Sequence, residues 1–565
     1  MQINNAHSFH IPVMGLGYTA DTPIKVAAYG ISSVISLVDD LLMEQLREKY
    51  CMELNLPFAA ITSKVEDFRA KRISSYLNMV DDIVKEKVAH LKKSVSEVGG
   101  EFEKYISILP HNSPIRARYN LAQKSKHLKE EFVNWVHDHL PTGDIDVNIM
   151  TKLDKVNYKD GEALESEHND AHSALRGFAE SKLNSSIVFS AGMNPKLFTY
   201  MERFKDFFPN ATGELKKKVI LKVSDFRSAL VQGKIFANKG IWVSEYRIES
   251  GVNCGGHAFP SNGVLLGPVL EEFKEKRDML LATCREAYHN ALEKKEIKAP
   301  TQAPEILISA QGGVGTHEEH QFLMEHYDMN AVGWGTPFML APDVVSIDQE
   351  TLDVLKNAGE KDLFFSQASP LGVPFNNVRR PEQDAQKRAN LASGKPGFPC
   401  VKQFLKYNTE FTEKPICTAS QSFQKMKIDE IKAQNLSDSE YQKELDTILT
   451  KDCLCVGLGN STLKSHDITP AFAGATVVCP GPNLAYFSEE MNLEKMCQHI
   501  YGEKSYLNDT PRPNMFIKEL NMYQEILQEK KAALVEGDKK GEREIKKFEN
   551  NLESGINYYK ALGLM

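Results

Sequence analysis

Residues 305–336 read EILISAQGGVGTHEEHQFLMEHYDMNAVGWGT and contain one complete unit of strand, turn, helix and strand. The first apolar run, Glu305 to Ala310, ends in a glycine-rich turn, and a polar stretch long enough for a short helix follows it. A second apolar run, Asn330 to Trp334, ends in another glycine turn. Short apolar runs that alternate with helical stretches predict parallel strands joined by crossover helices.

The same rhythm occurs along much of the chain. Several of the runs are apolar without interruption, as expected for parallel strands that are buried on both faces. The segments between them, such as Asn194 to Lys205 and Phe226 to Asn238, are long enough for crossover helices. The predicted fold is therefore an α/β protein with a (β/α)8 TIM barrel. The eight predicted strands are Phe9–Leu16, Ser32–Val38, Ile145–Thr151, Ser186–Ala191, Lys218–Ser224, Ile241–Ile248, Glu305–Ala310 and Asn330–Trp334.

Four regions are predicted in chain order. Residues 1–40 carry barrel strands one and two, and residues 144–345 carry strands three to eight. Residues 41–143 are rich in Glu, Lys and Leu at helical spacing and predict a helical insertion. Its charges would form a solvated face, or alternatively a contact with a partner or a second subunit. Residues 346–565 form a mixed and helical closing region, whose last charged helix is interrupted at Gly537.

Composition excludes several classes of protein. The 565 residues are 42% apolar and 25% charged, which is ordinary for a globular chain, and the formal net charge of −8 argues against nucleic-acid binding. No run approaches about 18 consecutive apolar residues, so no membrane span is expected. The N-terminus has no basic segment followed by an apolar one, so no secretory signal is expected. The nine cysteines show no regular spacing, which favours reduced thiols in a cytoplasmic protein.

The turns after predicted strands seven and eight indicate a phosphate-bearing ligand. Glycines allow a backbone to approach an anion closely, and a helix N-terminus adds aligned N–H donors. TIM barrels often hold a phosphate between the loops that follow strands seven and eight. A plain tight turn would explain one glycine cluster, but two at the ends of consecutive strands favour a binding site. The expected contacts are Gly312, Gly313, Gly315, Gly335 and Thr336.

The segment ESGVNCGGHAF (249–259) follows predicted strand six, where a barrel would direct His257 into its mouth. An imidazole that titrates near neutrality suits proton transfer at a carbon acid, which predicts a catalytic role for His257. Gly255 and Gly256 would let a flat ligand approach closely. Cys254 is either an ordinary buried thiol or a reactive one.

Two further positions are open to two interpretations. Lys222 lies in the apolar run of strand five, where a buried cation is costly unless it is paired. Its side chain either points outward to a helix or points inward, where it would neutralise charge on a ligand. Gly15, in the turn MGLGYTADTP (14–23) after strand one, either lines a cofactor or only shapes the turn.

These motifs, in this order, resemble the nitronate monooxygenase (2-nitropropane dioxygenase-like) family, which includes flavin-dependent enoyl-acyl-carrier-protein reductases. The resemblance extends over residues 9–40 and 144 to about 465. The segments that carry it are residues 11–40, IDVNIM (145–150), residues 186–205, ESGVNCGGHAF (249–259), SAQGGVG (309–315), GWGTPF (333–338), ASPLGVPFNNVRR (368–380), FPCVKQF (398–404), KPICTAS (414–420) and residues 455–468.

The resemblance implies an FMN cofactor and an oxidoreductase activity. It implies that His257 is the catalytic base, and that the glycines of the two late turns and Thr336 contact the FMN phosphate. Gly15, Lys222, Gly255 and Gly256 are then expected around the flavin ring. The chain would act as a nitronate monooxygenase-like enzyme on a small molecule. The alternatives are an NAD(P)H-dependent enoyl-acyl thioester reductase and a flavin-binding protein without turnover.

The sequence also departs from the family pattern. Phe259 stands where the family has glycine, two places after the histidine, and we expect it to alter the substrate pocket. The helical insertion is unusual for the family and would serve as a contact for a second subunit or a carrier protein. No G-x-G-x-x-G fingerprint follows a strand, so any NAD(P)H would bind only transiently. Cys453 and Cys455 lack the C-x2-C spacing of typical cluster or zinc sites, and no metal site is expected.

Overall fold

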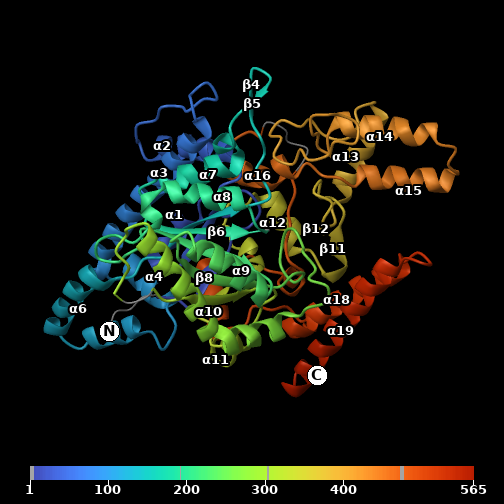
Figure 1. Ribbon diagram of the computed structural model, residues 1–565. Helices are drawn as coiled ribbons and strands as arrows, with labels where there is room; N and C mark the ends of the chain where they lie inside the picture. Colours follow the sequence, from blue (N-terminus) through green and yellow to red (C-terminus); the bar gives the residue numbers. More distant parts are fainter. Residues whose placement is uncertain (1–5, 191, 302–303, 471–475) are drawn as a thin grey trace.

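The computed structural model describes residues 6–190, 192–301, 304–470 and 476–565, and its centre is a closed barrel of eight parallel strands (Figure 1). Around the barrel the strands follow the order β1-β10-β9-β8-β7-β6-β3-β2. All eight predicted strands are confirmed, as is the TIM-barrel fold; the predicted end of the fourth, Ala191, lies outside the described residues. The barrel strands are β1 (Phe9–Ile11), β2 (Ser32–Ser36), β3 (Ile145–Met150), β6 (Ser185–Ser190), β7 (Lys217–Val223), β8 (Val243–Glu249), β9 (Leu307–Gln311) and β10 (Ala331–Gly333).

Polar side chains occupy part of the barrel interior. Arg247 is buried and forms ion pairs with Glu245, at 2.9 Å, and with Asp146, at 3.8 Å. The hydroxyl group of Ser309 also donates a hydrogen bond to Glu245. Because buried charges are tolerated only when they are paired, this cluster accounts for the charged residues on otherwise apolar strands.

The helices that follow the later strands cover the barrel. These are α8 (Pro195–Tyr200), α9 (Phe226–Ala237), α10 (Leu266–Lys294), α11 (His317–His326) and the 3-10 helix η6 (Thr336–Leu340). The helix expected over residues 226–238 is confirmed as α9. The helix expected over residues 194–205 is shorter, because two 3-10 turns, Met201–Arg203 and Lys205–Phe207, replace its second half.

The segment between β2 and β3 is helical, and part of it belongs to the barrel layer. It comprises α2 (Asp40–Glu53), α3 (Phe68–Lys93), α4 (Glu101–Ile108), α5 (Pro114–Ala122) and α6 (Lys126–His139). Ile73, Tyr76 and Leu77 of α3 are fully buried in the main hydrophobic core, next to α7 (Asp170–Ala179). Helices α4–α6 instead form a smaller apolar cluster around Phe102 and Phe132. The expected contact of this segment with a partner stays a prediction.

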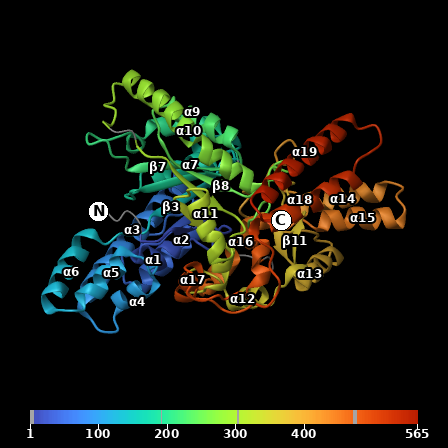
Figure 2. The ribbon, with the colours of Figure 1, turned by 90° about the horizontal axis from the view of Figure 1, so that it is seen from below.

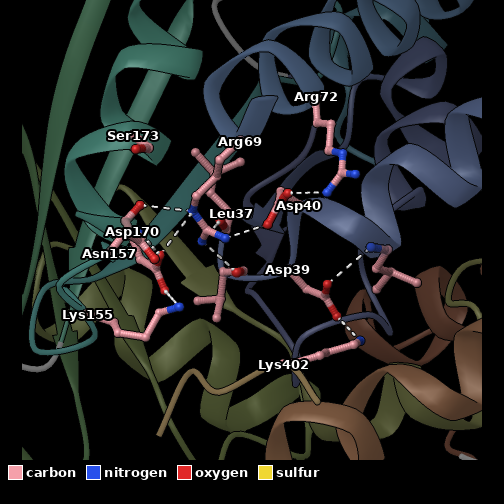
Figure 3. Close-up of polar contacts among 12 residues, drawn as sticks. Leu37, Asp39, Asp40, Arg69, Arg72, Lys155, Asn157, Asp170, Ser173 and Lys402 are labelled. Carbon is pink, nitrogen blue, oxygen red and sulfur yellow. Dashed lines mark hydrogen bonds and ion pairs between the residues drawn. The ribbon is translucent and has the colours of Figure 1, made fainter. Parts of the chain in front are cut away.

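A buried ion-pair network joins helix α3 to the end of strand β2 (Figure 3). Arg69 and Arg72 of α3 both bind the carboxylate of Asp40, and the Arg72 nitrogen lies 2.8 Å from it. The Arg69 guanidinium also donates to the backbone oxygens of Val38, at 2.7 Å, and Asp170, at 3.2 Å. The planar guanidinium with its several donors can bridge three segments in this way. Helix α3 is therefore tied to both β2 and α7.

The closing region covers one end of the barrel and extends away from it. Helices α4–α6 and helices α13–α15 lie at opposite ends of the molecule in both views (Figures 1 and 2). The last charged helix is interrupted at Gly537, where φ is +87°, as predicted. No described helix is long and apolar enough to cross a membrane. The elements of this region are α12 (Gln349–Lys356), β11 (Leu363–Ser366), β12 (Phe375–Val378), α13 (Pro381–Ala392), α14 (Gln421–Ala433), α15 (Asp438–Leu449), α16 (Leu454–Ser465), α17 (Leu493–Ile500), α18 (Met515–Ala532) and α19 (Lys539–Ala561).

Candidate active site

A cavity of about 420 Å³ lies at the C-terminal ends of the barrel strands. Its floor and sides come from the residues that end or follow the eight strands, and its cover comes from the closing region. This is the end of a TIM barrel at which active sites are built. The cavity brings together nine of the ten residues expected at the site: Gly15, Lys222, Gly255, Gly256, His257, Gly312, Gly313, Gly335 and Thr336.

The two late turns offer backbone and hydroxyl donors to the cavity. Gly312 and Gly313 have φ angles of +109° and +87°, in the region where residues other than glycine are strained. A Cβ atom on Gly313 would lie 2.0 Å from the Asn253 side chain, so only glycine fits there. The Thr336 hydroxyl oxygen accepts a hydrogen bond from the Gly481 N–H, at 3.0 Å. Its own hydrogen is therefore free to donate to a ligand.

Gly315, the tenth expected residue, is not brought to the cavity. Its N–H donates to the carboxylate of Glu319, at 2.9 Å, and the Thr316 hydroxyl caps the start of helix α11. Arg512 pairs with the same carboxylate, at 2.7 Å. Groups of the protein therefore already engage the donors at this helix N-terminus, and the structure does not bring Gly315 to the expected ligand site.

His257 is held from two sides by the closing region. Its Nε2 lies 2.8 Å from the hydroxyl oxygen of Ser369, and its ring packs edge-on against Phe375 at 5.0 Å between centroids. Burial, and then the positive charge of Lys222, lower the pKa of His257 to about 4. The imidazole is therefore neutral at physiological pH and able to accept a proton.

Lys222 points into the cavity, which decides between the two orientations considered from the sequence. Its ammonium nitrogen lies 2.7 Å from the carboxylate of Glu249, which in turn accepts a hydrogen bond from the Gln311 side chain at 2.6 Å. Burial is the largest single influence and lowers the pKa of Lys222, but the interactions with Glu249 and Cys254 together raise it above its ordinary value. Lys222 therefore carries a fixed positive charge at the cavity wall.

The segment before His257 is clamped by the cover. Gly256 donates its N–H to the Cys479 carbonyl oxygen, at 3.1 Å, and accepts a hydrogen bond from the Asn376 N–H, at 2.9 Å. A Cβ atom on Gly255 would lie 2.6 Å from the Cys479 carbonyl oxygen. Burial and the nearby Glu249 raise the pKa of Cys254 well above its ordinary value, which keeps its sulfur a protonated, unreactive thiol.

Polar cavity residues that the sequence reasoning missed lie at the ends of the strands. Among the described residues, the side-chain oxygens of Asn148 and Asn253 are buried without a hydrogen-bond partner, although both residues line the cavity. Unpaired buried acceptors are rare in proteins and fit a ligand with N–H or O–H donors. In the sequence, only their position relative to the strands could have indicated these residues. Asn148 lies near the end of β3, and Asn253 lies in the segment after β8.

The covered side of the cavity is apolar. Phe259 and Phe375 line it, and the Lys152 ammonium nitrogen lies 5.4 Å from the centre of the Phe259 ring. The remaining apolar residues of this wall are Met150, Phe404, Leu405, Leu454 and Leu458. Phe259 thus contributes to the pocket, as expected from its unusual place after His257. The cavity therefore has a polar floor beside Lys222 and His257 and an apolar roof.

Comparisons with known proteins give weak likenesses to solved barrel structures. No protein-family model matches the chain, and no curated protein matches it. The chain is similar to FabK from Thermotoga maritima, with 12% identity and a TM-score of 0.38 over 93% of this chain and 96% of that one. It is also similar to the enoyl reductase domain of MlnA from the macrolactin biosynthesis cluster of Bacillus amyloliquefaciens, with 11% identity and a TM-score of 0.43 over 88% and 94%.

A third similar structure is nitroalkane oxidase from Streptomyces ansochromogenes, with 10% identity and a TM-score of 0.36 over 88% of this chain and 94% of that one. Likenesses this weak assign no activity, and the function proposed below depends on the cavity and its residues.

Proposed function

We propose that this protein is a flavin-dependent oxidoreductase with FMN in the cavity at the mouth of the barrel. The observation that supports this most is the convergence of two separate groups of residues on one cavity. The glycine turns after β9 and β10 reach it from one side, and Lys222 and His257 reach it from β7 and from the segment after β8. A phosphate-bearing redox cofactor would use both groups.

The residues present fit FMN. The phosphate would accept hydrogen bonds from the backbone of Gly312, Gly313 and Gly335 and from the Thr336 hydroxyl. Two unpaired oxygens, on Asn148 and Asn253, would accept hydrogen bonds from the cofactor. The fixed charge of Lys222 would stabilise negative charge near the cofactor ring. When bound, FMN would supply the electron transfer, which the side chains of this cavity cannot perform by themselves.

His257 would move the proton in the reaction. The pKa of about 4 keeps the His257 imidazole neutral, and the contact with Ser369 fixes the orientation of the ring. A substrate carbon under the apolar roof would therefore meet a neutral base that is held in place, with bulk water displaced by aromatic and aliphatic side chains. Such positioned proton transfer contributes roughly 10²- to 10⁴-fold to a rate.

The apolar roof favours a second candidate, an enoyl-acyl thioester reductase that uses NAD(P)H. The seven hydrophobic residues named for this wall would contact an acyl chain more readily than a small nitroalkane. In this case a proton would pass from solvent to the substrate carbon through the neutral His257, which would accept one proton as it gives up another. The cytoplasmic location and a carrier-protein contact through helices α3–α6 belong to the same proposal.

Purified protein tests the cofactor first and the reaction second. A preparation with flavin absorbance, or one that gains it on addition of FMN, supports the proposal; a colourless protein that does not bind FMN refutes it. Flavin reduction is then followed without oxygen, with NADH, NADPH and nitroalkanes in turn. Reduction by a nitroalkane supports the first reaction, and reduction by a nicotinamide followed by reoxidation with an enoyl thioester supports the second.

His257→Ala separates catalysis from binding. If the variant retains FMN but loses most of its turnover, His257 acts in the chemistry. Unchanged turnover in the FMN-loaded variant would exclude the catalytic role, and a flavin that no donor reduces would leave the chain as a binding protein.

A further inference from the structure

Four thiols border a second, smaller void behind one wall of the large cavity. The void measures about 10 Å³, which is room for about one water molecule. Its four cysteines come from three separate places in the closing region. They are Cys400, Cys417, Cys453 and Cys455.

Backbone pairing places Cys400 and Cys417 on neighbouring segments. The Phe398 N–H donates to the Ala419 carbonyl oxygen, at 3.0 Å, and Asn408 exchanges two hydrogen bonds with Ile416. The segment that carries Cys400 is also tied to the barrel by an ion pair between Lys402 and Asp39, which follows β2 (Figure 3). Both thiols are therefore held by structure on each side, while 16 residues separate them along the chain.

The two thiols differ in exposure. Cys400 is half-buried and lies next to the exposed Val401, whereas Cys417 is buried, with 6% of its surface exposed. A reagent from solvent would reach Cys400 first. This is the arrangement of an attacking thiol in front of a resolving one.

The four thiols are not arranged as metal ligands in this structure. Within the described parts of the chain, no three Cys, His, Asp or Glu side chains are placed to hold a metal ion. The void of about 10 Å³ is also far smaller than an iron–sulfur cluster.

We propose that Cys400 and Cys417 are a redox-active pair that closes reversibly into a disulfide. Nothing in the proposed flavin chemistry requires this pair, and it would operate whether or not FMN is bound.

The electrostatics of the two sulfurs assigns their roles. The interaction with Cys417 contributes most to lowering the pKa of Cys400 to about 7. The charge of Lys406 and the Gln403 N–H also lower this pKa, whereas burial raises it. The same interaction and burial raise the pKa of Cys417. Burial also raises the pKa of Cys453 to about 11 and that of Cys455 further still. Of the four thiols, Cys400 has the lowest pKa and is the most readily deprotonated near neutral pH, and the thiolate is the nucleophile.

The closing step balances with a small disulfide such as glutathione disulfide as the oxidant. The Cys400 thiolate attacks one sulfur, forms a mixed disulfide and releases one glutathione thiolate. Cys417 loses its proton to solvent and attacks the Cys400 sulfur, which displaces the second glutathione thiolate. The protein loses two electrons and the one proton of Cys417, and the glutathione disulfide becomes two glutathione thiolates, which take up protons from solvent.

The redox state of Cys400 and Cys417 would affect the shape of the large cavity. Leu454 and Cys455 line both voids. Phe404 and Leu405 lie between Cys400 and Cys417 in the chain and form part of the apolar roof. A disulfide would fix the loop that carries these two side chains, and so would tie the shape of the roof to the redox state.

Peptide mapping tests the link directly in the full-length protein. Lys402 and Lys406 lie between the two cysteines and neither precedes a proline, so trypsin separates Cys400 from Cys417 unless a disulfide joins the fragments. After incubation with glutathione disulfide and alkylation of free thiols, we expect one linked pair of peptides containing Cys400 and Cys417. Dithiothreitol should separate it, and two of the nine thiols should disappear from a thiol titration and return.

Variants provide the matched controls. Cys400→Ser and Cys417→Ser should each abolish the linked peptides, whereas Cys51→Ser, which removes a buried thiol of helix α2, should leave them unchanged. Three results would overturn the proposal: two free thiols after oxidation across a range of glutathione ratios, a link to Cys453 or Cys455 instead, or stoichiometric iron or zinc in the purified protein. None of these results depends on whether the protein binds flavin.

Discussion

Lys222 and His257 are coupled through their charges, although they come from different strand ends. Because the positive charge of Lys222 lowers the pKa of His257, its removal should raise that pKa from about 4 toward the ordinary value of 6.5. Burial contributes more than Lys222, so the shift should be partial. We expect Lys222→Met to move the acidic limb of the pH–rate profile to higher pH, or to move the titration of His257 followed by NMR.

Lys152→Met is the matched control for this prediction. Lys152 also lines the cavity, but it is not among the causes of the lowered pKa of His257. An identical shift in both variants would mean that the charge of Lys222 has no specific effect on His257.

A single methyl group should distinguish the turn after β9 from an ordinary glycine turn. Gly313→Ala combines a φ of +87° with a Cβ atom 2.0 Å from Asn253, so it should both destabilise the protein and weaken FMN binding at least tenfold. Gly394→Ala has a similar φ of +73° but open space around its Cβ atom, and should cost only about 1 kcal/mol. Flavin titration and thermal unfolding of both variants measure the difference, and equal FMN affinity would remove Gly313 from the phosphate site.

At the scale of elements, the network around Arg69 should hold helix α3 on the barrel. Arg69→Met leaves the buried Asp40 and Asp170 with fewer partners, and breaking one side of a buried ion pair costs about 3–5 kcal/mol. We expect a clear fall in the thermal midpoint. Lys182→Met is the control, since its pair with Asp82 is more than half exposed and should contribute less than about 1 kcal/mol.

Helix α18 carries a buried carboxyl group that should make stability depend on pH. Glu519 accepts hydrogen bonds from Ser250 and from the Leu266 N–H, and burial raises its pKa from 4.5 to about 7. The folded protein thus binds its proton more tightly than the unfolded chain does. The resulting stability is complete below pH 4.5 and is lost as the pH rises through 7.

Glu519→Gln removes this titration and keeps one of the two acceptor oxygens, at a cost in stability that does not change with pH. Its stability relative to the parent protein should therefore increase between pH 5 and pH 8, by at most about 3 kcal/mol. Thermal unfolding at both pH values measures the change, with Glu525→Gln on the exposed side of the same helix as the control. A stability difference that stays constant with pH would show that Glu519 does not titrate in this range.

The sequence predicted the strands well because each is an apolar run bounded by polar turns. It also led to most of the expected residues that line the cavity, since Gly312, Gly335 and His257 follow strand ends, where barrel ligands bind. It did not reveal that the Gly315 N–H is taken by the Glu319 carboxylate, with which Arg512 also pairs; Arg512 lies far along the chain and only the fold brings it there. The thiol cluster was missed for the same reason, since its cysteines lie in segments that are separated along the chain and that only the fold brings together.

The place of helix α3 in the barrel layer was missed for a different reason. Its apolar face has the spacing of any amphipathic helix, and only contact with α7 distinguishes a barrel helix from an inserted one.

At the scale of the whole molecule, two parts of the closing region should contribute very differently to the stability of the fold. Helices α14 and α15 project from the barrel and have a small apolar cluster of their own (Figure 1). The Gln424 side chain donates to the Ile448 carbonyl oxygen, at 3.0 Å, so a short Gly-Ser linker can replace residues 426–446. We expect this deletion to lower the thermal midpoint only slightly and to leave FMN binding intact.

Helices α18 and α19 should instead be essential for folding. They bury six large side chains against the rest of the protein, namely Phe516, Leu520, Tyr523, Phe548, Leu552 and Tyr559. At about 1.5–3 kcal/mol for each buried side chain, their loss amounts to about 9–18 kcal/mol, as much as the 5–15 kcal/mol by which a typical domain is stable. A chain that ends at residue 513 should therefore show no cooperative unfolding transition. If the chain that ends at residue 513 folds with an unchanged thermal midpoint, α18 and α19 form a separate unit. If the α14–α15 deletion unfolds the protein, the α14–α15 hairpin belongs to the barrel core.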